Sequence, residues 1–88
     1  LSLGLTNWVC EPEELGAKAM EIARRLATGP TVAYRYMKEN FARAASSGDV
    51  DDCLDLEATH HIHCGQTDDH KNATKAFVEK REPLFTGR

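Results

Sequence analysis

The stretch "TGPTVAYRYMKENFARAASSGD" (residues 28–49) decides the fold, because it contains one helix together with the signals that bound it. Gly29 suits the left-handed turn that ends a helix, and Pro30 cannot continue the helix before it. From Pro30 or Thr31 to about Ala45, apolar residues recur at helical spacing. The closing "SSGD" predicts a stop. The stretch therefore predicts a central helix with a further helix on each side.

One helix is predicted before this stretch, from about Pro12 to Ala27. Pro12 fits the first turn of a helix, where its missing N–H costs nothing. A single apolar stripe of helical period follows, made of Leu15, Ala19, Ile22, Ala23 and Leu26. Residues 1–11 lead into it as a short strand or an extended segment, in which Trp8 is expected to pack in a core rather than stack on a ligand.

Two helices are predicted after the stretch. Asp49 is a good N-cap for a helix over residues 50–64. The fourth helix, capped by Thr67 or Asp68, runs to about Lys80. The fold class is therefore all-α, an orthogonal bundle of about four helices preceded by a short strand-like segment.

The apolar residues of the last segment outnumber the surfaces that could cover them. Four amphipathic helices in 88 residues cannot bury every apolar face on one another, and Phe77, Leu84 and Phe85 are left without cover. Exposed apolar surface of this kind marks a partner surface. We therefore expect self-association or docking on another domain.

Composition narrows the classes of function. The chain is 41% hydrophobic and 28% charged, which is typical of a folded protein. No apolar run reaches the ~20 residues that span a bilayer, so no membrane partner is expected. A net charge of −3 argues against nucleic acid as a partner. Three cysteines without a CxxC pair indicate a reducing, cytoplasmic location, and a start without methionine suggests a piece of a longer polypeptide.

All four histidines fall in "THHIHCGQTDDH" (residues 59–70). Four side chains of the predicted third helix share a face and suit Zn²⁺ by chemistry: Cys53, Glu57, His60 or His61, and Cys64. One continuous helix cannot wrap a tetrahedral ion, and His63 and His70 point elsewhere. We therefore predict no metal ligand and a structural role for the histidines, with a small zinc-binding helical module as an alternative.

A histidine paired with a carboxylate could also transfer protons. Glu57 lies at helical spacing from His60 and His61, which suits either a proton-transfer pair or a surface ion pair. We predict no catalytic residue in this chain.

The segment "FVEKREP" (residues 77–83) combines a ring with two cations. Lys80 and Arg81 at a helix C-terminus complement the helix dipole, which is an ordinary structural role. Together with Phe77 they could also offer a ring for stacking and charges for a nucleotide phosphate.

Three quoted segments carry a resemblance to a known family: "GLTNWVC", "TGPTVAYRYMK" and "TDDHKNATKAFVEKREPLFTGR". Together they resemble, in order, the C-terminal region of the enoyl-CoA hydratase/isomerase (crotonase) superfamily. The resemblance implies that residues 1–11 end the crotonase core and that residues 12–88 form the helical C-terminal domain. The chain departs from the family pattern at Asn72, Ala73 and Lys75.

The resemblance also implies a function. The parent would hydrate or isomerise an enoyl-CoA, with catalytic carboxylates and oxyanion-holding N–H groups on a core that this chain lacks. The chain itself would help to close the acyl-CoA site and to form a trimer or a dimer of trimers. Phe77 and Lys80, with Arg81 as a further cation, would contact the CoA adenine or phosphate. A non-catalytic self-association domain is the remaining alternative.

Overall fold

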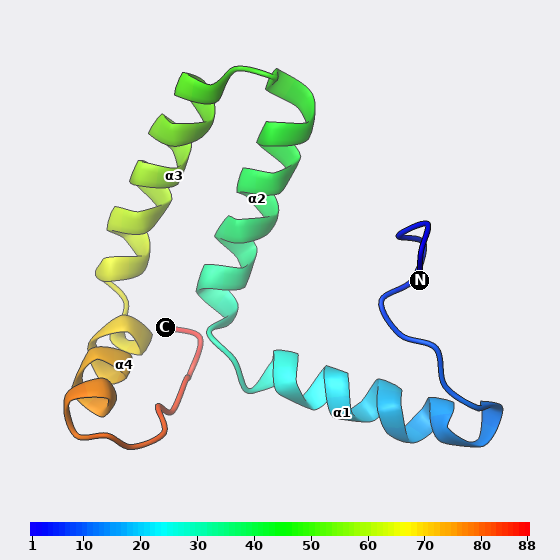
Figure 1. Ribbon diagram of the computed structural model, residues 1–88. Coiled ribbons are helices and arrows are strands. Elements are labelled where there is room, and N and C mark those ends of the chain that lie inside the picture. The colour runs from blue at the N-terminus through cyan, green and yellow to red at the C-terminus, as the bar shows by residue number, and fades with distance from the viewer.

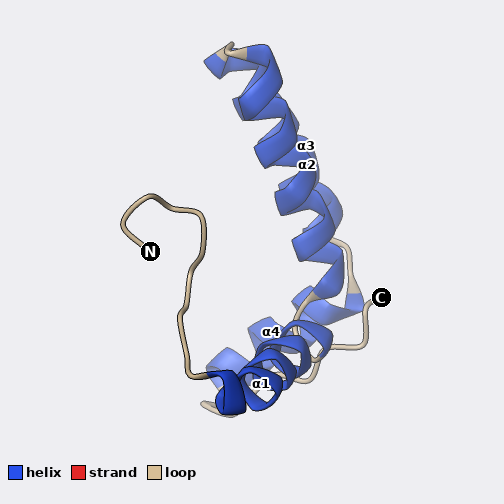
Figure 2. Ribbon diagram, turned by 90° about the vertical axis from the view of Figure 1, so that its right-hand side faces the viewer, coloured by secondary structure: helices blue, strands red, loops and turns tan.

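The computed structural model describes all 88 residues and is all-α, as predicted. A short 3₁₀ turn and four helices follow one another along the chain (Figure 1): η1 (Pro12–Glu14), α1 (Leu15–Ala27), α2 (Thr31–Ser47), α3 (Val50–Gly65) and α4 (Asp68–Val78). Figure 2 shows helices and loops only. None of the helices has the length and apolar character that crossing a bilayer requires.

The first eleven residues form an extended loop, the second of the two predicted alternatives, and no strand. The Thr6 hydroxyl donates to the Trp8 carbonyl at 2.8 Å. Trp8 is 54% exposed, so the expected core role is wrong for this chain. The reason is that the N-terminal segment extends away from the helices (Figure 1).

Local capping sets the turn between α2 and α3. Gly48 adopts φ 65, a left-handed conformation in which glycine carries no steric penalty. The Asp49 side chain accepts hydrogen bonds from the backbone N–H groups of Asp51 (2.9 Å) and Asp52 (3.3 Å), which confirms the predicted N-cap. Arg43 of α2 pairs with Asp52 at 3.0 Å and ties the two helices beside the turn.

The turn between α1 and α2 depends on glycine for a different reason from the one predicted. Gly29 has no positive φ. Instead, the ring of Tyr34 lies where a Cβ on Gly29 would stand. Gly29 therefore permits a close approach of side chain to backbone, and the predicted left-handed cap at this position is wrong.

Helices α2 and α3 pack side by side as an antiparallel hairpin, and α1 leaves the hairpin as a separate arm (Figure 1). The side chains of α2 face two ways: Tyr36 and Asn40 are half-buried toward α3, whereas Met37 and Phe41 are 54% and 74% exposed. Helix α4 lies at the end of α3, at the foot of the hairpin, and the C-terminal tail returns from it toward the start of α2 (Figure 1).

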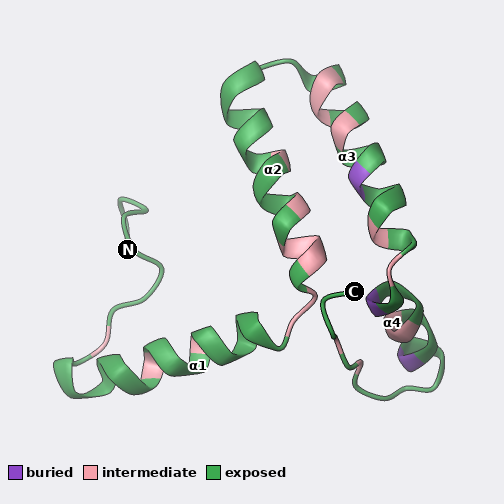
Figure 3. Ribbon diagram, turned by 180° about the vertical axis from the view of Figure 1, so that it is seen from behind, coloured by how far each residue is buried: buried purple, intermediate pink, exposed green.

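Very little of the chain is buried. Only His60, Asp69 and Ala76 are removed from solvent (Figure 3). The radius of gyration is 16.5 Å, against about 12 Å for a compact protein of this length. The accessible surface of 7362 Å² exceeds the expected value for this mass, about 5,200 Å², by about 2,200 Å². The chain therefore leaves an extra surface that a compact protein would have covered.

Replacing Asp49 by alanine should lower the free energy of unfolding by about 1 kcal/mol, because two N–H groups of α3 lose their acceptor. The measurement is urea unfolding followed by circular dichroism. Asp51→Ala is the matched control, since it removes the same charge from the same turn without removing the cap. Equal losses in the two variants would show that charge near the helix terminus, rather than capping, provides the stabilisation.

Candidate functional site

The C-terminal end of α4 has a hydrogen-bond pattern that is normally built around glycine. The Lys80 N–H donates to the Phe77 carbonyl at 3.2 Å, and the Arg81 N–H donates to the Ala76 carbonyl at 3.0 Å. This pair of bonds defines a Schellman motif, which places Lys80 in the left-handed conformation at φ 53. A side chain there costs about 1–2 kcal/mol relative to glycine. Lys80 is the one residue other than glycine with a positive φ.

This corner exposes an aromatic ring and an unpaired cation. Phe77 is 84% exposed, and Lys80 is exposed as well. The two lysines within α4 are paired, Lys71 with Asp68 at 3.0 Å and Lys75 with Glu79 at 3.9 Å. Lys80 takes part in no ion pair or side-chain hydrogen bond. The structure therefore places two of the three predicted site residues where a ligand could reach them.

The third predicted site residue, Arg81, is occupied by partners within the chain. Its guanidinium donates to the Glu79 carboxylate at 2.6 Å, to the Glu82 carbonyl at 3.3 Å and to the Asn72 side-chain oxygen at 3.3 Å. A phosphate would have to displace some of these acceptors. Arg81 as a phosphate contact stays a prediction, and its observed contacts brace the turn.

A single carboxylate holds the C-terminal tail. Asp69 is 4% exposed and accepts from the Thr86 N–H (2.6 Å), the Thr86 hydroxyl (3.2 Å) and the Gly87 N–H (2.9 Å). Its own N–H, one of the donors that a helix N-terminus leaves without an intrahelical partner, donates to the Arg88 backbone oxygen at 3.0 Å. We call these four bonds the Asp69 clamp.

The clamp perturbs the acidity of Asp69. The hydrogen bond from the Thr86 N–H, with further bonds from the Gly87 N–H and the Thr86 hydroxyl, holds the pKa of the Asp69 carboxyl below its ordinary value. Burial acts in the opposite direction and is outweighed. The carboxylate is therefore the form that grips the tail.

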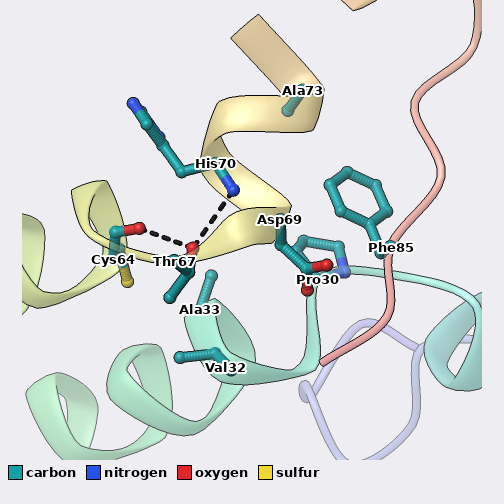
Figure 4. A pocket seen from close by; sticks show the side chains of 9 residues that line it. All are labelled: Pro30, Val32, Ala33, Cys64, Thr67, Asp69, His70, Ala73 and Phe85. Carbon is teal, nitrogen blue, oxygen red and sulfur yellow. Dashed lines mark hydrogen bonds between the residues drawn. The ribbon is translucent and has the colours of Figure 1, made fainter. Parts of the chain in front are cut away.

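The tail covers one side of a small cavity of about 220 Å³ (Figure 4). Its lining is mainly apolar and comes from the start of α2, the α3–α4 corner and the tail: Pro30, Val32, Ala33, Cys64, Thr67, Asp69, His70, Ala73 and Phe85. The Thr67 hydroxyl donates to the Cys64 carbonyl (2.6 Å) and accepts from the His70 N–H (3.1 Å), which fixes the α3–α4 corner and confirms Thr67 as the cap of α4. Sequence spacing gave no signal for this cavity, because its walls lie up to 55 residues apart.

The histidine cluster does not assemble a metal site. No group of three His, Cys, Asp or Glu side chains is placed to hold an ion, so the zinc-module alternative has no ligand set. His60 lies buried between α2 and α3, with Nδ1 2.6 Å from the Asn40 side-chain oxygen and Nε2 3.2 Å from a Glu39 carboxylate oxygen. Its ring stacks on Tyr36, with the centroids 4.4 Å apart.

The carboxylate beside His60 is thus that of Glu39, and not that of Glu57, which the helical spacing predicted as a partner. Glu39 belongs to the neighbouring helix, and spacing along one helix cannot identify a partner on another. His60 has the expected structural role, in joining α2 to α3, whereas His61, His63 and His70 are exposed.

Two hollows beside α2, one toward α1 and one toward α3, share Met37 and Phe41, and we call them together the α2 apolar surface. The larger, about 670 Å³, also includes Leu26 of α1, and the smaller, about 270 Å³, also includes Cys53 and Glu57 of α3. Both hollows are open, and Met37 and Phe41 stay more than half exposed in them. This surface is therefore suited to docking rather than to holding a small ligand.

Comparison with known proteins gives consistent matches over the whole chain. The family model for enoyl-CoA hydratase/isomerase matches residues 1–88. A short-chain-enoyl-CoA hydratase of Clostridium acetobutylicum is 38% identical over 93% of this chain and 31% of its own length. A 1,2-epoxyphenylacetyl-CoA isomerase of Escherichia coli is 34% identical over 97% of this chain and 32% of its own length.

A solved structure gives the same result. It is described as an enoyl-CoA hydratase/isomerase from Mycobacterium abscessus, and it matches 99% of this chain with a TM-score of 0.93 and 36% identity. The match covers 33% of that chain. The chain thus spans about a third of the length of the relatives that it matches.

The Asp69 clamp should open in acid. Because the folded-state pKa of Asp69 is lowered, the carboxylate stabilises the clamp fully above the ordinary aspartate value of about 3.9. That stabilisation is lost as the pH falls below it toward the lowered pKa. The amide NMR signals of Thr86 and Gly87 should therefore shift with a midpoint below about 3.9. Asp69→Asn should abolish that titration, and a midpoint at or above the ordinary value would contradict the clamp.

Proposed function

The chain belongs to the enoyl-CoA hydratase/isomerase family, and from that premise we propose that it is the helical C-terminal part of a longer acyl-CoA enzyme. The length of the relatives, about three times that of this chain, supports the proposal. So does the excess surface of about 2,200 Å². A standard interface covers about 800 Å² per partner, so a single contact of that size would not cover it.

We propose hydration or isomerisation of an enoyl-CoA as the reaction of the parent. The relatives named above include a hydratase and an isomerase that act on CoA thioesters. In this proposal the chain contributes no catalytic group: the acid and base carboxylates and the N–H groups that hold the thioester oxyanion belong to the core. The chain helps to close the site and to assemble a trimer or a dimer of trimers. The three free cysteines fit a reducing cytoplasm.

In this proposal the exposed corner at the end of α4 binds the nucleotide end of CoA. Lys80 would meet a phosphate of the CoA nucleotide, and Phe77 would lie against the adenine. Lys80 is suited to this role because its ammonium has no partner in the chain, unlike those of Lys71 and Lys75. Arg81, whose donors are engaged, would support the corner.

The α2 apolar surface supports the docking role. Met37 and Phe41 are more than half exposed and lie beside Leu26, which is 55% exposed. Burying such side chains stabilises an assembly by about 1.5–3 kcal/mol each. A catalytic core or a neighbouring subunit would cover these side chains. Self-association without catalysis is the second candidate function, because the same apolar surface could join two copies of the parent.

Turnover separates the two candidates. The longer protein should hydrate or isomerise a short enoyl-CoA such as crotonyl-CoA, with the change in the conjugated thioester followed by absorbance. The 88-residue chain alone should show no rate above background. A folded trimer of the longer protein without turnover would favour the self-association domain instead.

Replacing Lys80 by glutamine in the longer protein should raise KM for acyl-CoA about three- to tenfold and leave kcat unchanged. A contact with the nucleotide binds the ground state and the transition state equally, so it changes affinity rather than the chemical step. Steady-state kinetics at low and high salt provides the measurement. Lys71→Gln is the matched control, because this exposed lysine of the same helix is already paired with Asp68. An unchanged KM in Lys80→Gln would remove Lys80 from the site.

A further inference from the structure

We propose that Asn72 is a positioning residue for acyl-CoA binding, because its side chain braces the turn that presents Lys80. The inference rests on the proposed function, in which Lys80 meets the nucleotide end of CoA. Asn72 itself touches no ligand in this account. It acts through the backbone of the segment that follows α4.

Asn72 joins α4 to both sides of the turn. Its Nδ2 donates a hydrogen bond to the Leu84 carbonyl, and its Oδ1 accepts one from the Arg81 guanidinium at 3.3 Å. Arg81 directly follows Lys80, and Leu84 lies where the chain returns along the helix. The half-buried amide of Asn72 therefore holds the chain on both sides of one turn, at Arg81 where it leaves α4 and at Leu84 where it comes back.

The turn needs such a brace because its conformation is unfavourable for lysine. A side chain in the left-handed region is disfavoured by roughly five- to thirtyfold relative to ordinary backbone. Lys80 stays there at φ 53 through the two hydrogen bonds of the Schellman motif, and the second of them needs Arg81, whose side chain Asn72 holds. If the segment after Lys80 were released, the backbone at residue 80 could relax, and the ammonium would move away from its present position.

The Asp69 clamp holds the same segment after α4 at a second place. Asp69 and Asn72 are three residues apart on α4 and therefore lie on one face of the helix. Asp69 holds Thr86 and Gly87, whereas Asn72 holds the turn at Arg81 and Leu84. The tail is thus fastened at two successive points.

The brace should affect affinity rather than the rate of the chemical step. A cation held in its binding position loses less conformational freedom when it meets a phosphate, so preorganisation lowers KM. A loosened corner would cost binding energy only for ligands that reach Lys80. This selectivity separates positioning from a general loss of stability.

The experiment compares two substrates in Asn72 variants of the longer protein. With acyl-CoA, Asn72→Leu should raise KM about three- to tenfold, as expected for the loss of two hydrogen bonds, with kcat within about twofold of the unchanged protein. With the matching acyl-pantetheine thioester, which lacks the nucleotide, KM should not change. Thr74→Leu is the control, since Thr74 is exposed on the same helix and its hydroxyl donates only to the His70 carbonyl.

Asn72→Asp provides an independent variant should leucine prevent folding. Aspartate can still accept from Arg81 but cannot donate to the Leu84 carbonyl, so the rise in KM for acyl-CoA should be intermediate. Equal rises for both substrates, or a fall in kcat larger than the rise in KM, would overturn the positioning role.

A double variant separates this inference from the proposal on which it rests. If Asn72 acts through Lys80, adding Asn72→Leu to Lys80→Gln should raise KM no further. Fully additive effects, or a normal KM in Asn72→Leu alongside a raised KM in Lys80→Gln, would overturn the inference and leave the proposed function standing. A normal KM in Lys80→Gln would instead overturn the role of Lys80 in the proposed function.

Discussion

The need to cover apolar side chains governs this structure, because the chain cannot meet that need by itself. Ala76 is the one apolar residue that is fully removed from solvent. Leu15 and Leu26 of α1, and Met37 and Phe41 of α2, are all more than half exposed. In most domains burial of such side chains provides the main stabilisation. Here that contribution would come from surfaces outside the 88 residues.

Polar contacts therefore define most of the shape that the chain does have. The α2–α3 hairpin is joined through His60, whose ring stacks on Tyr36 and meets Asn40 and Glu39. The tail is joined to α4 through Asp69 and Asn72. Hydrogen bonds are directional, so they can fix the position of a turn even where packing is thin. The Lys80 corner is positioned in this way.

The accuracy of the sequence-based predictions followed the distance between interacting residues. The caps at Asp49 and Thr67 were predicted correctly, because a capping side chain meets backbone N–H groups two or three residues away. The Asp69 clamp was not predicted, because its partners lie 17 and 18 residues further along the chain. Exposure of Phe77 and Leu84 was expected from the shortage of apolar partners and is observed. The same expectation for Phe85 is wrong, because its ring is half-buried in the wall of the cavity beside α4. The left-handed conformation of Lys80 had no sequence signal, because glycine would be expected there.

Hydrogen exchange tests the central claim, that these helices are a docking surface for parts outside the chain, most directly. The measurement compares the amides of α1 (Leu15–Ala27) in the 88-residue chain and in the longer protein. We expect the α1 amides to exchange fast in the chain alone, because the apolar stripe of α1 is uncovered there. We expect strong protection of the same amides in the longer protein, where a partner covers the stripe. Equal and strong protection of α1 in both, with the isolated chain a stable monomer, would contradict the account.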